Sequence, residues 1–314
     1  MIIEARDVVK HYKEKLVLDH MDLEIGEGEI FGLLGPNGSG KTTFIKCLLG
    51  LASYEKGNIK IFDKSMKERA YEIKKNIGIV MQDIGVYDEL TVYENVDYFC
   101  SLYIKDTAKR RELVDEAIEM VDLQEQEKAY PSTLSGGMLR RLNIACGVAH
   151  KPKLIIFDEP TIAIDVNLRE KIIAGIKRLN RMGSTILYTS HYMEEVEVLC
   201  NQIAIMNNGK VVARGSKEAL LGMIEAGENI SIEVDEMTDE ILNEIKSLPH
   251  VERVRYEERK IEVQYTKGKN NLITLLDYLA KREIHIGDIS DRMPNLNDVF
   301  KELTGKELAR QVSR

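Results

Sequence analysis

The sequence contains two glycine clusters that could each hold a phosphate group. The first, GPNGSGKTT at 35–43, fits the pattern G-x-x-x-x-G-K-[ST] through Gly35, Gly40, Lys41 and Thr42. Glycines let backbone N–H groups approach a β-phosphate closely, and the helix predicted to follow adds a favourable dipole. The lysine would neutralise phosphate oxygens, and the threonine hydroxyl would ligate Mg²⁺. The residues predicted to hold the phosphates are Gly35, Asn37, Gly38, Ser39, Gly40, Lys41, Thr42 and Thr43.

An acidic pair ends the apolar segment KLIIFDEP at 153–160. The apolar residues predict a buried strand, and Asp158 at its end would hold Mg²⁺ through water. Glu159 is placed to polarise a water molecule for attack on the γ-phosphate. Acidic residues after an apolar strand are also common as ordinary loop starts. Their occurrence together with the first cluster favours the catalytic interpretation.

The second cluster, LSGGM at 134–138, opens the predicted helix MLRRLNIACGVAH. Ser135, Gly136 and Gly137 would offer backbone N–H groups and a hydroxyl at that helix N-terminus, which makes a second anion site. A kinase or small GTPase with a single site has no use for it. Two protomers arranged head to tail do, because each second cluster can close on the ATP held by the partner's first cluster.

The elements that must position these residues belong to two predicted domains. Short apolar runs alternate with helical patterns to about residue 225, which indicates a mostly parallel α/β sheet. The opening strands predict an antiparallel β annex, and helical spacing predicts a helical subdomain at about 85–150. The predicted strands are IIEARDVV, LVLDHMDLEI, EIFGLLG, IGIVMQ, KLIIFDEP, STILYTS and QIAIMNNGKVVARG.

A change of pattern near residue 226, at the glycine-containing EAGEN, predicts a linker between domains 1–226 and 227–314. The segments that follow predict the order β-α-β-β-α-β-α. This order fits a small C-terminal α+β domain of ferredoxin-like type.

Composition limits the class of protein. The chain of 314 residues is 44% hydrophobic and 31% charged, with a net charge of −8, which is typical of soluble globular proteins without a general affinity for nucleic acid. No apolar run approaches the roughly 18 residues that a bilayer span needs, and the N-terminus lacks the features of a signal peptide. The widely separated cysteines indicate reduced thiols. We therefore expect a cytoplasmic protein whose membrane role, if any, depends on a partner.

The ordered set GPNGSGKTT, Gln82, LSGGM, LIIFDEP, Asp165 and His191 resembles the nucleotide-binding subunits of ABC transporters over residues 1–225. The resemblance implies a P-loop NTPase cassette that binds ATP with Mg²⁺. It implies that Gln82 touches Mg²⁺ and the attacking water and links the helical subdomain to the site. It further implies that Asp165 reaches across the dimer and that His191 contacts the γ-phosphate and Glu159. Tyr12 would stack on adenine, although a lone tyrosine is more often part of a core.

Two departures from the family pattern lie near these motifs. Met138 replaces the usual glutamine of the second cluster, and Ala163 and Ile164 stand where glycine and leucine are usual. Neither change removes a group that contacts phosphate, so we expect ATP hydrolysis to be retained at an altered rate. The Ala163 side chain is expected to stiffen its loop.

The resemblance also predicts the partners. Such subunits pair with a second copy or a related ATPase subunit, and dock a short helix of a separate transmembrane permease on the helical subdomain. Of the four tyrosines there, we expect most rings in the core and one or two exposed for docking. They are Tyr87, Tyr93, Tyr98 and Tyr103. The protein would thus be peripheral on the cytoplasmic face of the membrane.

The ending NLNDVFKELTGKEL resembles the C-terminal extension of drug- and antibiotic-export ATPases of the daunorubicin-exporter type, which favours export. The extension could join two subunits, regulate them, or be a solvated appendage. Two other functions stay open at this stage. One is a non-transport ABC ATPase, and the other is a regulatory dimer that binds ATP without turning it over.

Overall fold

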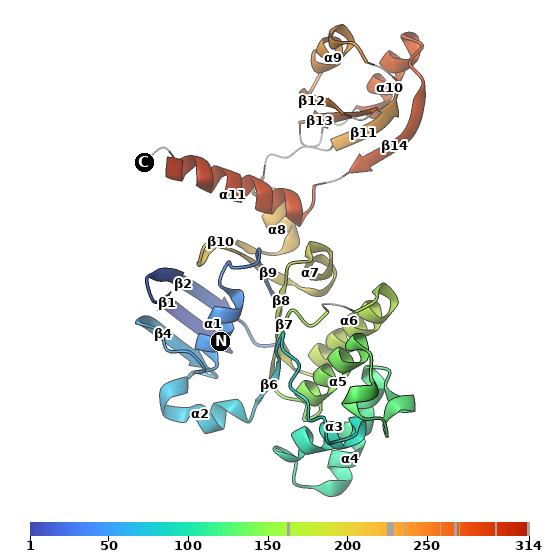
Figure 1. Cartoon of the computed structure of the whole chain (residues 1–314). Helices are drawn as coiled ribbons and strands as arrows, with labels where there is room; N and C mark the ends of the chain where they lie inside the picture. The colour runs from blue at the N-terminus through green and yellow to red at the C-terminus, as the bar shows by residue number, and fades with distance from the viewer. Residues whose placement is uncertain are drawn as a thin grey trace. The chain divides into compact units, whose positions relative to one another are not determined.

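The computed structural model describes the chain except residues 162–163, 225–228, 236, 258, 267–268, 270, 293 and 313–314. The described residues form two compact units, Met1–Lys217 and Glu218–Arg314 (Figure 1). The predicted linker at 225–229 lies almost wholly outside the described residues, so the boundary near residue 226 stays a prediction. Within the described residues, no helix combines the length and the apolar character that crossing a bilayer requires.

A six-stranded sheet in the order β10-β9-β3-β8-β7-β6 organises the first unit. Its members pair in parallel except β10, which is antiparallel to β9. Every residue of β3, β7 and β8 is buried, as expected of parallel strands covered on both faces. The predicted parallel α/β sheet is therefore confirmed. The strands are β3 (Ile30–Leu34), β6 (Ile77–Val80), β7 (Leu154–Asp158), β8 (Thr185–Ser190), β9 (Gln202–Asn207) and β10 (Lys210–Gly215).

The predicted antiparallel annex is present as a second sheet in the order β2-β1-β4-β5. Its third strand, β4, and the next two elements, β5 and α2, were not predicted. The short polar segment KGNIKI gives a weak strand signal, but Ile59 and Ile61 are buried because β4 pairs with the first strand. The elements are β1 (Ile3–Tyr12), β2 (Lys15–Ile25), β4 (Lys56–Ile61), β5 (Lys64–Ser65) and helix α2 (Met66–Lys74).

Helix α1 (Lys41–Leu48) connects the two sheets through one hydrophobic core. Phe44 and Ile45 of this helix pack in the same cluster as Ile3 of the annex and Leu187 of the central sheet. This packing fixes the helix N-terminus, where the first glycine cluster lies. Two further helices, α6 (Val166–Arg181) and α7 (Met193–Leu199), follow β7 and β8.

The predicted helical subdomain is confirmed by α3 (Val92–Ser101), α4 (Thr107–Met120) and α5 (Gly136–Val148). Local caps explain where two of them begin. Thr91 and Glu94 form a capping box at α3, and Asp106 accepts a hydrogen bond from the backbone N–H at the start of α4. Short 3₁₀ turns at Gln124–Gln126 and Pro131–Thr133 lead into α5. Helix α5 then returns the chain to the central sheet through β7.

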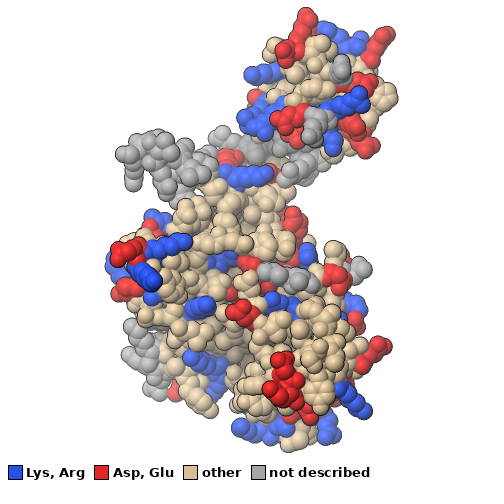
Figure 2. All heavy atoms as spheres, viewed as in Figure 1, with Lys and Arg blue, Asp and Glu red and all other residues tan. Residues whose placement is uncertain are grey.

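The second unit has an antiparallel sheet in the order β12-β13-β11-β14, and α9 and α10 contribute to its core. The sequence of elements agrees with the predicted small α+β unit. On the face drawn in Figure 2, acidic and basic side chains of this unit are interspersed. The elements are α8 (Lys217–Gly222), β11 (Asn229–Val234), α9 (Asp239–Lys246), β12 (Val251–Glu257), β13 (Lys260–Tyr265), α10 (Leu272–Lys281), β14 (Ile286–Arg292) and α11 (Leu296–Val312).

Candidate functional site

The first glycine cluster forms a tight loop between β3 and α1. A Cβ atom on Gly35 would lie 2.3 Å from the Met206 carbonyl oxygen, so only glycine lets the loop pass this closely to β9. Gly38 and Gly40 adopt φ values of 81° and 108°, which a side chain would strain. The glycines of the motif are thus explained by backbone geometry at the N-terminus of a helix.

Lys41 is held at the mouth of this loop and is only 5% exposed. Its Nζ donates to the carbonyl oxygens of Gly35 at 2.7 Å and Pro36 at 3.2 Å. The same nitrogen lies 3.3 Å from Oε1 of Glu159. The predicted phosphate-binding cation and the predicted base are therefore neighbours.

Thr189 of β8 fixes the acidic pair at the end of β7. Its hydroxyl donates to Oδ1 of Asp158 at 2.7 Å, and the Glu159 N–H donates to the hydroxyl and carbonyl oxygens of Thr189 at 3.1 and 3.2 Å. These contacts hold Glu159 at a φ of 51°, a conformation that costs a non-glycine residue on the order of 1–3 kcal/mol. Sequence reasoning missed Thr189, because its partners lie about 30 residues away along the chain.

Asp158 offers an oxygen that suits a cation. The side chain is fully buried, and its Oδ2 has no hydrogen-bond partner among the described residues. Buried carboxylate oxygens normally have a partner, and a hydrated Mg²⁺ would supply one. Within the described part of the chain, no three His, Cys, Asp or Glu side chains gather as in a dedicated metal site. A cation here would therefore depend largely on phosphate oxygens and hydroxyl groups.

His191, directly after β8, completes the contacts of Glu159. Its Nδ1 lies 3.0 Å from Oε2 of Glu159, and its ring lies 4.1 Å from that of Tyr192. Glu159 therefore contacts Lys41 through one oxygen and His191 through the other. The predicted pairing of Glu159 with His191 is present.

Lys41, Glu159 and His191 line one cleft with a volume of about 610 Å³, within the range of small-molecule sites, whereas Asp158 lies behind its lining. Tyr12 lies on its wall and is 47% exposed, so the ring is not part of the core. Lys10 Nζ lies 5.0 Å from the centre of this ring. The predicted residues that line the cleft are Tyr12, Asn37, Gly38, Gly40, Lys41, Thr42, Thr43, Gln82, Glu159 and His191.

The hairpin between β9 and β10 supplies cleft residues that sequence reasoning missed. Asn208 and Gly209 line the cleft, and the Gly209 N–H donates to the Ser39 carbonyl oxygen at 2.9 Å. A Cβ on Gly209 would lie 2.5 Å from the Val17 carbonyl oxygen. The Asn-Gly pair signals a hairpin, but not its contact with the phosphate loop.

The second cluster does not line this cleft. The exposed Ser135 caps α5 by accepting a hydrogen bond from the Met138 N–H at 3.3 Å. Its neighbour Gly136 is also exposed. A Cβ on Gly136 would meet nothing within 4 Å among the described residues outside its own helix and chain neighbours. The chain's own fold therefore does not require glycine at this position, unlike at Gly35.

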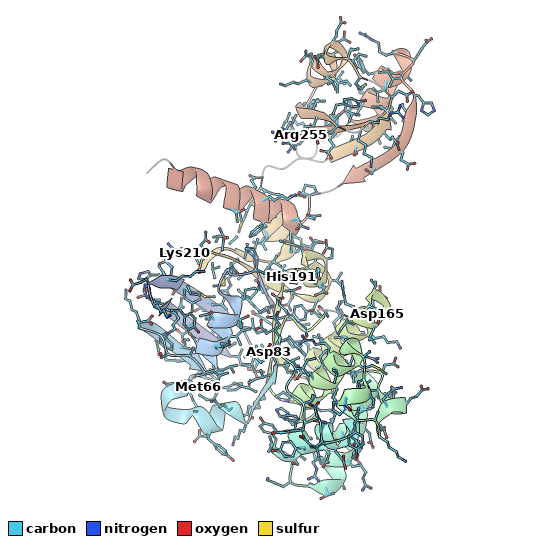
Figure 3. All side chains as sticks on the ribbon, in the orientation of Figure 1. Met66, Asp83, Asp165, His191, Lys210 and Arg255 are labelled. Carbon is cyan, nitrogen blue, oxygen red and sulfur yellow. The ribbon has the colours of Figure 1, made fainter. Side chains whose placement is uncertain are left out.

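Asp165 also lies outside the cleft. It caps α6 by accepting a hydrogen bond from the Leu168 N–H at 3.0 Å, and its side chain is exposed. Figure 3 shows Asp165 at the start of α6, apart from His191. Ala163, the departure expected to stiffen this loop, lies outside the described residues.

One prediction about the helical subdomain is wrong. Tyr87, Tyr98 and Tyr103 are 45%, 41% and 38% exposed, so most of the four rings lie at the surface and not in the core. The buried residues of α3 are Val92, Asn95, Val96 and Cys100. The rings of Tyr87 and Tyr98 instead contact one another, with centres 5.0 Å apart.

Comparisons with known proteins agree on one family. A family model described as "ABC transporter" matches residues 18–162. The chain is 35% identical over 309 residues to the linearmycin resistance ATP-binding protein LnrL of Bacillus subtilis (strain 168), covering 98% of this chain and 99% of that protein. It is 33% identical over 308 residues to the Nod factor export ATP-binding protein I of Rhizobium sp. (strain N33), covering 98% of each.

A similar solved structure supports the same family. The dimeric ATP-binding cassette MJ0796, in a post-hydrolysis state bound to ADP and Pi, matches with a TM-score of 0.63 and 28% identity. The match covers 68% of this chain and 98% of that chain.

Proposed function

The chain belongs to the ABC transporter family, and we propose that it is the subunit that binds and hydrolyses ATP to drive export through a separate membrane subunit. The similar proteins named for linearmycin resistance and Nod factor export support the direction of transport. They match over the second unit as well as the cassette, because each covers 98% of the chain.

ATP would bind in the cleft, with its adenine against Tyr12 and its phosphates in the first glycine loop. Lys41 would turn its ammonium group toward the β- and γ-phosphate oxygens. Thr42, Gln82 and Asp158 would hold Mg²⁺, and the unpartnered Oδ2 of Asp158 is the observation that supports a cation there. Mg²⁺ in such a site neutralises charge that develops on the phosphate oxygens.

Glu159 is the proposed base for the attacking water. Its carboxylate is 8% exposed and lies between Lys41 and His191, which orients it toward the end of the phosphate loop. Nδ1 of His191 contacts Glu159, so Nε2 is the ring nitrogen that faces the γ-phosphate, to which it donates when the imidazole carries both protons. The chain thus supplies a group for water activation beside a group for charge stabilisation.

The second cluster is proposed to close on the ATP of a partner protomer. Ser135, Gly136 and Gly137 do not line the chain's own cleft, and nothing in the described part of the chain crowds a Cβ on Gly136. Glycine there is explained if a phosphate from another chain approaches the α5 N-terminus. Asp165, exposed and outside the cleft, is proposed to reach the partner's loop. The dimeric state of the similar cassette MJ0796 supports this arrangement.

The membrane subunit is proposed to dock on an exposed aromatic surface formed by Tyr87, Tyr98, Leu102 and Tyr103. These side chains are 38% to 52% exposed, and Tyr98 packs edge-on against Tyr87. Exposed aromatic clusters are favoured at protein interfaces. Docking there would hold the protein on the cytoplasmic face of the membrane, next to the segment that begins at Gln82.

The experiment that tests this function is the solution mass of the full-length Glu159→Gln variant, measured by light scattering with and without MgATP. Without its base, the variant should retain ATP between two protomers, so the mass should double only with the nucleotide. Wild-type protein, which would turn ATP over, should show a smaller and transient increase.

The matched control is the double variant Glu159→Gln with Ser135→Arg. It should bind ATP but stay monomeric, because the arginine side chain would occupy the space of the partner's γ-phosphate. A Glu159→Gln variant that binds ATP and stays monomeric would count against the shared site. ATP-dependent doubling that persists with Ser135→Arg would show that the second cluster is not at the interface.

A further inference from the structure

Glu195 of α7 is a buried carboxylate that the proposed chemistry does not use directly. It is only 3% exposed. The Thr161 hydroxyl donates to both of its oxygens at 2.8 Å, and the hydroxyls of Tyr188 and Ser190 donate to Oε2 at 2.8 and 3.1 Å. Arg169 Nε lies 3.2 Å from Oε1, an ion pair without hydrogen-bond geometry. Four residues from separate parts of the chain thus converge on one side chain.

This convergence offsets the cost of burial. A carboxylate taken out of water loses its solvation, and hydrogen bonds and an opposite charge must offset that cost. Burial, and after it the charge of Glu195, raise the pKa of Tyr188 well above its ordinary value, so the phenol stays protonated and can donate. A buried, satisfied glutamate can be merely structural. The positions of its donors along the chain indicate a role beyond stability.

The donors lie next to the residues proposed to act on ATP. Thr161 follows Glu159 by two positions, and Ser190 directly precedes His191. The Ser190 hydroxyl also accepts from the Tyr192 N–H at 2.9 Å, which fixes the turn that carries the histidine. Glu195 therefore connects the segment that follows Glu159 to the segment that precedes His191.

Arg169 extends these contacts to the loop before α6. Its Nη2 donates to the Ile164 carbonyl oxygen at 3.5 Å, and its backbone N–H donates to the Asp165 carbonyl oxygen at 2.9 Å. The guanidinium also lies 5.1 Å from the centre of the Tyr192 ring, which contacts His191. The start and the end of the loop that carries Asp165 are thus tied to the same carboxylate.

We propose that Glu195 is a positioning residue for ATP hydrolysis, which holds Thr161 and, through Arg169, Asp165 in register with Glu159 and His191. The inference rests on the proposed function, because Asp165 matters to catalysis only if it contacts a partner protomer. Contact between Asp165 and the partner would then affect the positions of Glu159 and His191 through the hydrogen bonds of Glu195 with Thr161 and Ser190. Glu195 does not line the cleft, so its effect is on turnover and not on binding.

The test compares Glu195→Gln with Glu194→Gln in the full-length protein. Glu194 is exposed on the same helix and makes a matched control. The amide has nearly the same shape as the carboxylate but turns a donor toward the hydroxyls or Arg169. We expect kcat to fall by about 10- to 100-fold, the range that small misplacements of reacting groups produce. KM and the Kd for MgATP should stay within about threefold of wild type, since no cleft contact is lost.

A second pair of variants tests the same positioning role even if Glu195→Gln folds poorly. Thr161→Ser keeps the hydroxyl and should keep most of kcat, whereas Thr161→Val removes it at nearly equal volume and should lower kcat. If both residues act through their shared hydrogen bond, the double variant of Glu195→Gln and Thr161→Val should lose much less than the product of the single losses. Thermal unfolding of each variant separates lost turnover from lost stability.

The outcomes distinguish the two claims. An active wild type together with a folded Glu195→Gln that keeps its kcat overturns the inference alone. Equal kcat in Thr161→Ser and Thr161→Val overturns it as well, as does a raised KM at unchanged kcat. A wild-type protein without ATPase activity, alone or with its membrane partner, would instead refute the proposed function and the inference with it.

Discussion

Replacement of Lys41 by methionine tests the phosphate loop most directly, because the two side chains have similar length but only lysine carries a charge. A hydrogen bond to a charged group contributes about 1.5–3 kcal/mol. Lys41 would gain such bonds with phosphate oxygens. It would also give up part of its contacts with Gly35 and Pro36 at 2.7 and 3.2 Å and with Glu159 at 3.3 Å.

The net loss in binding is therefore smaller than the sum of the new bonds. We expect about 2–4 kcal/mol, which corresponds to a rise in the Kd for MgATP of roughly 30- to 700-fold. The same variant leaves the buried Glu159 carboxylate with His191 as its remaining basic neighbour among the contacts described. We therefore also expect a loss of stability of about 1–3 kcal/mol.

Isothermal titration with MgATP measures the first effect, and thermal unfolding without nucleotide measures the second. Lys46→Met is the matched control, since Lys46 lies on the same helix but is exposed and does not line the cleft. The control should bind MgATP like wild type. A folded Lys41→Met variant with a Kd within about threefold of wild type would refute the assignment of the loop.

Three further predictions follow from the described contacts. Ser135→Arg in the wild-type background should bind MgATP with unchanged affinity but lose ATPase activity, because Ser135 lies outside the chain's own cleft; a phosphate-release assay showing normal turnover would contradict the shared site. Deletion of residues 227–314 should leave the Kd for MgATP unchanged, since every residue lining the cleft lies between Tyr12 and Gly209; a folded truncation that fails to bind would show that the domain boundary is misplaced. Burial lowers the pKa of His150 from 6.5 to about 4, so the unfolded chain takes up this proton first as the pH falls. The free energy of unfolding should drop between pH 6.5 and 4 at up to roughly 1.4 kcal/mol per pH unit. His150→Phe, which keeps a ring against Tyr103, should lessen this drop. If thermal unfolding shows that wild type and His150→Phe lose the same stability between pH 7 and pH 5, the prediction is contradicted.

The fold could be read from the sequence where the signal is local. Apolar runs such as LIIF predict buried parallel strands because both faces of such a sheet are covered. The order of elements in the second unit follows from alternating strand and helix patterns. Strand β4 was missed because KGNIKI is short and mostly polar, and it becomes a strand only by pairing with β1.

Surface and core could not be separated for the aromatic residues of the helical subdomain. Helical spacing suggested that most tyrosines are buried, but Tyr87, Tyr98 and Tyr103 are exposed. Spacing predicts which residues share a face of a helix. It does not predict which face other helices cover, since that depends on their packing.

The phosphate loop, the acidic pair after β7 and the second glycine cluster could be predicted from the sequence alone. Each is a contiguous motif whose function depends on backbone conformation and on neighbouring residues. Three sets of contacts became known only from the folded structure: Thr189 with Asp158, Gly209 with Ser39, and Glu195 with three hydroxyl donors and Arg169. These contacts join residues from different strands and helices, so they exist only once the sheet has assembled. Local sequence patterns carry no information about such distant partners.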